Sequence, residues 1–135
     1  MVKDMVAFNF RLLPGGTIKI EGEIPPDAKQ FKLKLGKDRF NIGILLNPIF
    51  NHGGKKNVIH YNYMTQGVWR DDKKMEEFPF MPGSKVEVCI NFVGHFFLLF
   101  LPGNVKLNFF NHLCLLEINY FQVSGDFKVQ KVTFE

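Results

Sequence analysis

Adjacent carboxylates occur twice in the segment DDKKMEE at residues 71–77, and these are the side chains best suited by type to acid–base chemistry. Two carboxylates that flank a glycosidic bond hydrolyse it when one is held protonated and the other is ionised. The protonated member needs surroundings that raise its pKa, and the two lysines between these pairs lower it instead. The segment therefore indicates an ion-pair network on a strand rather than a catalytic site.

The histidines offer no stronger case for catalysis or metal binding. His52, His60, His95 and His112 show neither H-x-H nor H-x₃-H spacing, and no cysteine pair accompanies them. The sequence contains no G-x-S-x-G, P-loop or G-x-G-x-x-G motif. We therefore predict that the chain is not an enzyme and uses no metal or other cofactor.

Groups that could bind a ligand occur in two places. Asn47 interrupts the apolar run GILLNPIFN at residues 43–51, and the segment Asn57–Glu77 collects polar, charged and aromatic side chains. The single tryptophan, Trp69, lies in this segment between Gly67 and Arg70, so we expect its ring to be exposed. A polar stretch that carries an aromatic ring within a regular sheet is where a binding face is expected.

Strands must position these groups, because apolar and polar residues alternate with a period of two along most of the chain. Five segments show the pattern: TIKIE (17–21), FKLKL (31–35), KVEVCIN (85–91), VKLNF (105–109) and FKVQKVTF (127–134). Turn signals such as PGG (14–16), GKD (36–38) and SGD (124–126) separate them. No helical periodicity is present. These features predict an all-β fold, an antiparallel β-sandwich, with one domain over residues 1–135.

Charge and hydropathy argue against two classes of partner. The net charge is +4, but acidic and basic residues are interleaved and no block of five like charges occurs. A solvated mixed surface fits this pattern better than a nucleic-acid interface. The longest apolar run, FFLLFL at 96–101, is too short to span a bilayer, so we predict no membrane insertion.

The two cysteines bear on the compartment. Cys89 and Cys114 both lie in apolar, strand-like runs, so we predict buried free thiols in a protein that folds under reducing conditions. The first residues, MVKDMVAFNF, lack the long apolar stretch of a signal peptide. The expected location is therefore cytoplasmic, with extracellular export only by a route that needs no signal peptide.

Several motifs in order resemble the carbohydrate-recognition domain of the galectin family. They are NP-x-FN at 47–51, NVIHYN at 57–62, WRDDKK at 69–74 and FPF-x-PG at 78–83. The family pattern runs H-x-N-P-R, V-x-N, W-x-x-E-x-R and then FPF-x-x-G. The resemblance covers nearly the whole chain, and its length is similar to that of prototype galectins, which have a single domain. It implies a jelly-roll sandwich like that of galectins and legume lectins, and a lectin that binds β-galactosides without metal.

The resemblance also implies a set of carbohydrate-binding residues. They are Asn47, Asn62, Trp69, Asp72 and Lys74, where the last two stand for the family's Glu and second Arg. Trp69 would provide a flat apolar platform for the C–H face of a sugar, worth about 1–2 kcal/mol. The spacing from Trp69 to Asp72 changes face on a regular strand, so we expect a turn or bulge between them.

Four positions depart from the family pattern. The family's His falls on Leu45 and its first Arg on Ile49, so both hydrogen-bonding residues that flank Asn47 are absent. Asp72 is one methylene shorter than Glu, and Lys74 lacks the planar fork of Arg. A site that loses hydroxyl partners discriminates less well. We therefore expect β-galactoside binding to be weakened, and its specificity relaxed toward sugars such as glucose or mannose.

Family resemblance further implies a homodimer that pairs the terminal strands MVAFNF (5–10) and KVTFE (131–135) and cross-links glycoproteins. An alternative is a galectin-fold protein that has lost sugar binding and serves a structural or protein-interaction role. A third interpretation, an intracellular lipid-binding barrel, is weaker. That fold requires a helical pair after its first strand, and residues 11–40 show only strands and turns.

Overall fold

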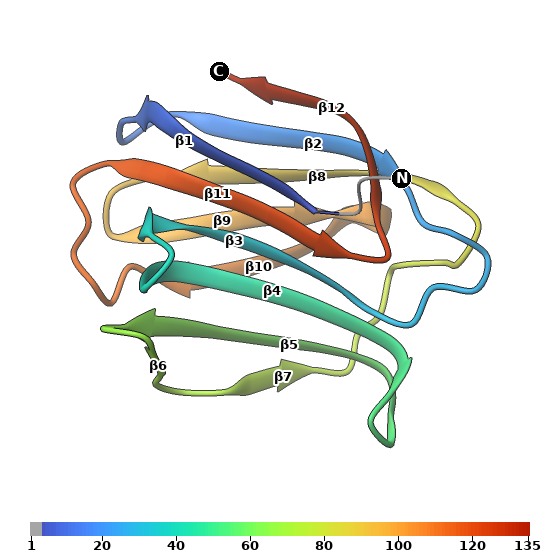
Figure 1. Ribbon diagram of the computed structural model, residues 1–135. Coiled ribbons are helices and arrows are strands. Elements are labelled where there is room, and N and C mark those ends of the chain that lie inside the picture. Colours follow the sequence, from blue (N-terminus) through green and yellow to red (C-terminus); the bar gives the residue numbers. More distant parts are fainter. Residues whose placement is uncertain (1–3) are drawn as a thin grey trace.

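The computed structural model describes residues 4–135, so the first three residues of the predicted 1–135 domain lie outside the described part. Two antiparallel sheets face each other and form a sandwich, as predicted (Figure 1). One sheet contains β1 (Met5–Leu12), β11 (Ile118–Gly125), β3 (Phe31–Asp38), β4 (Asn41–His52), β5 (Lys55–Thr65), β6 (Val68–Trp69) and β7 (Lys73–Met75). The other contains β10 (Val105–Phe110), β9 (Phe96–Leu101), β8 (Lys85–Phe92), β2 (Thr17–Glu23) and β12 (Lys128–Phe134). A 3₁₀ turn, Pro102–Asn104, connects β9 to β10.

Alternation of apolar residues explains why the sheets pack. In β2, Ile18 and Ile20 are fully buried, and in β3, Phe31, Leu33 and Leu35 are buried in the same way. Because side chains of a strand alternate between its faces, each sheet presents one continuous apolar surface to the other. All five predicted segments lie in strands or reach one residue beyond a strand end.

Phenylalanines fill the end of the core beneath the β4–β5 hairpin. The Phe31 ring stacks on Phe127 with centroids 4.8 Å apart and meets the edge of Phe80 at 5.4 Å. Phe78 in turn meets Phe50 edge to face at 5.2 Å. Offset and edge-to-face pairs are the favoured geometries of aromatic rings. The FPF motif thus anchors the connection from β7 to β8 under the strands that carry the candidate site.

The predicted turn GKD at 36–38 is wrong, because these residues continue β3 and the chain reverses at Arg39 and Phe40. Gly36 instead allows β3 and β4 to approach each other closely. A Cβ added at Gly36 would lie 2.3 Å from the carbonyl oxygen of Asn41, at a point where the β3–β4 register shifts. A glycine in a strand pattern therefore marked a bulge here and not a turn.

The prediction that both thiols are buried is also wrong. Cys114 is exposed and lies in the connection between β10 and β11, where it adopts a positive φ of 52°. Cys89 is half-buried on β8, and burial raises the pKa of its thiol. No helix in the described part of the chain is long and apolar enough to cross a membrane.

Candidate carbohydrate-binding site

The outer face of the seven-stranded sheet brings the predicted site residues together. In the β4–β5 ladder, Asn47 pairs with His60 and Leu45 pairs with Asn62. Lys74 of β7 pairs with His60 from the other side, so that a row of three polar residues crosses β4, β5 and β7. Side chains that are directly opposite each other in a ladder share a face.

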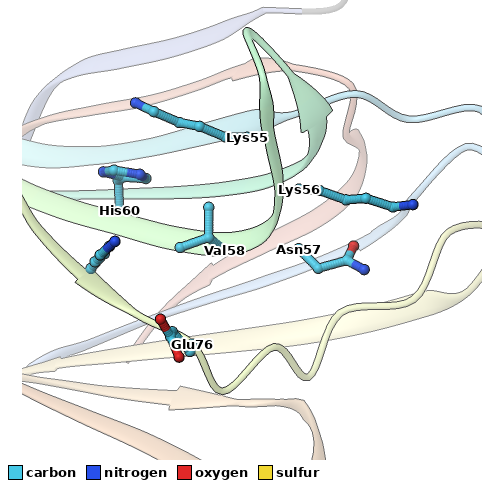
Figure 2. Close-up of a pocket in the computed structure, with 7 residues that line it drawn as sticks. Lys55, Lys56, Asn57, Val58, His60 and Glu76 are labelled. Atoms are coloured by element: carbon cyan, nitrogen blue, oxygen red, sulfur yellow. The ribbon is translucent and has the colours of Figure 1, made fainter.

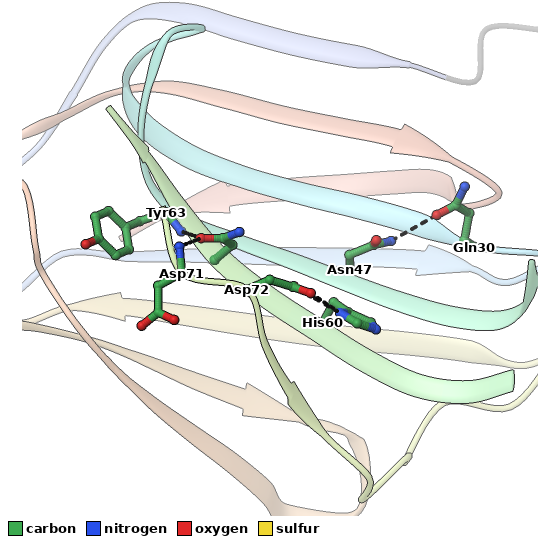
Figure 3. Close-up of polar contacts among 7 residues, drawn as sticks. Gln30, Asn47, His60, Tyr63, Asp71 and Asp72 are labelled. Atoms are coloured by element: carbon green, nitrogen blue, oxygen red, sulfur yellow. Dashed lines mark hydrogen bonds and ion pairs between the residues drawn. The ribbon is translucent and has the colours of Figure 1, made fainter. Parts of the chain in front are cut away.

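Asn47 is 8% exposed, and its amide hydrogens are already used within the fold. Its Nδ2 donates to the carbonyl oxygen of Phe31 at 2.7 Å and to Oε1 of Gln30 at 3.3 Å (Figure 3). The side-chain oxygen Oδ1 has no partner among the described residues. Asn47 therefore presents a hydrogen-bond acceptor, and not a donor, to a ligand.

Asn62 has the opposite arrangement. Its Oδ1 accepts hydrogen bonds from the backbone N–H groups of Tyr63 at 2.7 Å and Asp71 at 2.8 Å (Figure 3). Its Nδ2 has no partner within the described chain, which leaves two N–H donors. The structure thus leaves one acceptor at Asn47 and two donors at Asn62 for a ligand.

Trp69 lies at the end of this face and is 38% exposed, as its polar neighbours predicted. It pairs with Met64 in the short β5–β6 ladder. Arg70 fixes this corner, because its backbone N–H donates to the Tyr63 carbonyl at 3.0 Å and its guanidinium donates to the Thr65 side chain and carbonyl. Residues 70–72 lie outside the strands, between the end of β6 at Trp69 and the start of β7 at Lys73, so the chain is interrupted between Trp69 and Asp72 as their spacing predicted.

Lys34 was not predicted from the sequence, yet it reaches this corner. It pairs with Leu45 in the β3–β4 ladder, and its Nζ lies 5.6 Å from the centroid of the Trp69 ring. The side chain therefore extends from β3 across β4 toward β6. Burial and the neighbouring Lys32 ammonium lower the pKa of Lys34. A cation over an aromatic face is attracted by the ring quadrupole.

Asp72 contacts a residue that the sequence reading also missed. Both carboxylate oxygens of Asp72 lie 3.0 Å from Nδ1 of His60, which is the middle residue of the polar row (Figure 3). The His60 side chain is 12% exposed and the Asp72 side chain 57%. The expected ion-pair network among the acids and lysines is confined to Asp71 and Lys73, 3.7 Å apart, and Lys74 forms no ion pair with a described residue.

Leu45 and Ile49 flank Asn47 on the same face of β4. They are 8% and 5% exposed, and β4 is buried on both of its faces from Ile42 to Phe50. Two apolar walls therefore enclose the single acceptor of Asn47. No group of three or more metal-ligating side chains is present within residues 4–135.

Comparison with known proteins decides the family. The family model of galactoside-binding lectins matches residues 5–134. The chain belongs to the galactoside-binding lectin family. It is 42% identical to galectin-1 of Bos taurus over the full length of both chains, and 34% identical to a 16 kDa β-galactoside-binding lectin of Gallus gallus over 99% of each.

Solved structures of galactoside-binding lectins confirm the fold. CG-16, a homodimeric agglutinin from chicken liver, superposes with a TM-score of 0.94 at 34% identity, covering 98% of this chain and 99% of that chain. A toad ovary galectin, solved in complex with thio-digalactose, gives 0.93 at 27% identity over both full chains. Because this family consists of non-enzymatic lectins, the prediction that the chain is not an enzyme is confirmed.

The family pattern also explains what sequence reading overlooked at His60. When V-x-N is aligned on Asn62, the family's Val falls on His60. An apolar position of the galactoside-binding lectins thus carries an imidazole here, and it holds the carboxylate of Asp72. A histidine in place of the family's valine is the signal from which His60 could have been predicted. Lys34 lies outside the family motifs, so no sequence signal pointed to it.

Proposed function

We propose that the chain is a lectin that binds hexose-containing glycans on the outer face of β4, β5 and β6, with weakened and relaxed preference for β-galactosides. The observation that carries the proposal is the complementary pair of free groups beside Trp69. Asn47 Oδ1 accepts, Asn62 Nδ2 donates, and neither has a partner within the described chain. Hydroxyl groups both donate and accept, so one sugar ring can satisfy both amides.

The relaxed preference follows from the groups that surround Asn47. In place of two hydrogen-bonding side chains, buried Leu45 and Ile49 offer apolar walls. An apolar wall discriminates poorly between epimers that differ in one hydroxyl. Each missing hydrogen bond costs about 1 kcal/mol, so galactoside affinity should be lower by at least about tenfold than in a lectin that has both groups.

Titration calorimetry with lactose, N-acetyllactosamine and mannose tests this proposal. We expect weak binding of the galactosides, and affinity for mannose within about tenfold of theirs, because the axial 4-hydroxyl lacks two partners. Tight binding that excludes mannose would contradict the relaxed specificity. Absence of all binding would contradict the lectin proposal itself.

We further propose that the protein cross-links glycoconjugates as a homodimer. The edge strands β1 and β12 of the two sheets lie along the same side of the sandwich (Figure 1). Phe10 and Phe134 stack there with centroids 4.9 Å apart, while Phe8 is 64% exposed. Unpaired edges with exposed apolar side chains favour pairing with a second copy. Two weak sites in one particle then gain avidity.

Light scattering after size exclusion tests the dimer. The wild type should give twice the 15.6 kDa chain mass, and the Phe8→Lys, Phe134→Lys double variant should give the single mass. The double variant should keep the wild-type affinity for monovalent sugar. A monomeric wild type would contradict this part of the proposal.

A second candidate function is a galectin-fold protein that binds no sugar and contacts other proteins. The buried Leu45 and Ile49 and the Lys34 ammonium near the Trp69 ring favour it. Retention on columns of immobilised lactose and mannose separates the two candidates. Passage through both columns supports the second, and elution by free sugar supports the first.

We also propose a cytoplasmic location, with export by a route that does not use a signal peptide. Cys114 supports it, since an exposed free thiol is best preserved under reducing conditions. Fractionation of cells and medium, with immunodetection of the untagged protein, tests this part.

A further inference from the structure

A cleft of about 430 Å³ adjoins the candidate site on the β4–β5 hairpin side (Figure 2). It is lined by Lys55, Lys56, His60, Lys74 and Glu76, together with Asn57 and Val58. His60 and Lys74 belong to the polar row that begins at Asn47, so the cleft continues the site instead of forming a separate one. The cleft begins at His60, on the order of 7 Å along β5 from Asn62, because these two residues are two positions apart in a strand.

The charges of this cleft are unbalanced. Three lysines line it against one carboxylate, Glu76. Within residues 4–135, none of the three ammonium groups forms an ion pair with an acidic side chain. Asp72, which does not line the cleft, has both carboxylate oxygens on His60. The cleft therefore presents uncompensated positive charge to a ligand.

Of the two hairpin lysines, Lys55 is the one whose side chain extends toward the site. Figure 2 shows its side chain extending on the side of the hairpin where His60 lies, whereas the Lys56 side chain extends in the other direction. Lys74 reaches the same area from β7, where it pairs with His60. The ammonium groups of Lys55 and Lys74, from different strands, thus lie near the imidazole of His60, the middle residue of the polar row.

We propose that this cleft receives an anionic group, a sulfate ester or a carboxylate, carried by the sugar unit next to the one that contacts Trp69 and Asn47. The inference rests on the proposed lectin function and adds the chemical class of the ligand. Charge-assisted hydrogen bonds from ammonium groups to such an anion are stronger than those to a neutral hydroxyl. The Glu76 carboxylate at the far side of the cleft disfavours an anion placed beyond Lys74.

Titration calorimetry with matched ligands tests the proposal. The probes are N-acetyllactosamine, the same disaccharide with a 6-O-sulfate on its N-acetylglucosamine, and lactobionic acid, whose second unit carries a carboxylate. We expect the sulfated or the carboxylated probe to bind about five- to tenfold more tightly than the neutral disaccharide. The anionic probe that binds more tightly than the neutral disaccharide identifies the anion. The gain should shrink as sodium chloride rises, because exposed charges are screened.

Lys55→Gln is the decisive variant and Lys128→Gln its control, because Lys128 is an exposed lysine on β12 of the other sheet. Lys55→Gln should bind the anionic probe no more tightly than the neutral disaccharide, while its affinity for the neutral disaccharide stays unchanged. Lys128→Gln should bind both probes as the wild type does. Equal affinity for neutral and anionic probes would overturn the cleft assignment and leave the lectin function standing. A gain that survives Lys55→Gln would also overturn it, whereas absence of all sugar binding would overturn both proposals.

Discussion

The Lys34 ammonium lies 5.6 Å from the centroid of the Trp69 ring, so a cation from β3 contacts the aromatic platform of β6 before any ligand binds. The Lys34 side chain crosses β4 beside Leu45 to reach it. A sugar that stacks on Trp69 must share or displace this contact. Exposed cation–π contacts are worth about 0.5–1 kcal/mol, which is enough to affect the affinity of a weak site.

Removal of this cation should strengthen sugar binding. In Lys34→Met, the apolar stem that covers Leu45 remains while the charge is lost, so the ligand no longer displaces an ammonium group. We expect affinity for lactose to rise about two- to fivefold by calorimetry. Lys32→Met serves as the control of equal charge on the same strand. Weaker binding in Lys34→Met would show instead that the ammonium donates to the sugar.

Restoration of the two residues that flank Asn47 should restore preference for galactose. Leu45→His and Ile49→Arg together return two hydrogen-bonding groups to the outer face of β4. We expect lactose affinity to rise at least about tenfold, with little change for mannose. The matched control is Leu45→Phe with Ile49→Met, which keeps the face apolar. If the His and Arg variant folds and gains nothing for lactose, the site does not lie on this strand.

Loss of the Asn47 side chain should cost stability as well as sugar binding. The Asn47→Ala substitution removes the Nδ2 donor that bonds the buried Phe31 carbonyl at 2.7 Å. An unpaired buried acceptor costs about 1–3 kcal/mol, so the free energy of unfolding in urea should fall by that amount. Asn108→Ala, at an exposed position of β10, should change it by less than about 0.5 kcal/mol. Unchanged stability in Asn47→Ala would show that the bond to the Phe31 carbonyl does not stabilise the fold.

His112 should make the fold less stable in mild acid. Its ring stacks on Tyr63 with centroids 4.0 Å apart, and burial, followed by the Lys73 charge, lowers its pKa below the ordinary 6.5. Between the lowered pKa and 6.5 the unfolded chain binds more protons than the folded one. This contribution to stability is therefore complete above 6.5 and decreases as the pH falls below that value.

A comparison of urea unfolding at about pH 7.5 and about pH 5 tests this prediction. In His112→Phe, which keeps an aromatic ring against Tyr63 and cannot titrate, the loss of stability between the two pH values should be smaller than in the wild type. His52→Phe, on the exposed end of the β4–β5 hairpin, is the control. Equal losses in wild type and His112→Phe would rule out His112 as the cause.

The strands and the family were predictable from the sequence, because alternation with period two follows from burial on one face of a sheet. Local turn signals were less dependable. Gly36 reads as a turn residue, but a close contact with Asn41 required it within β3. Cys114 has apolar neighbours along the chain, yet it lies in a loop, where local hydropathy does not determine burial.

Part of the site depended on strand register, which a single sequence does not reveal. Asn47, Asn62, Trp69, Asp72 and Lys74 could be named from motifs. Strand pairing places four of them on one sheet, and Asp72 joins them through its contact with His60. Two further residues change the chemistry of the site: Lys34 lies near Trp69, and His60 contacts Asp72. Each contact joins segments that only the pairing of the strands brings together. Which hydrogen bonds each amide has left for a ligand likewise follows from tertiary contacts and not from residue type.

The bond from Asn47 to Phe31 has a consequence for how related sequences are read. An asparagine at this position helps to join β3 to β4 whether or not a glycan ever binds. Selection for folding alone would then preserve it in a descendant that had abandoned sugars. The diagnostic positions for sugar recognition are therefore 45 and 49, where apolar side chains form no hydrogen bond between strands, whereas Asn47 also serves the fold.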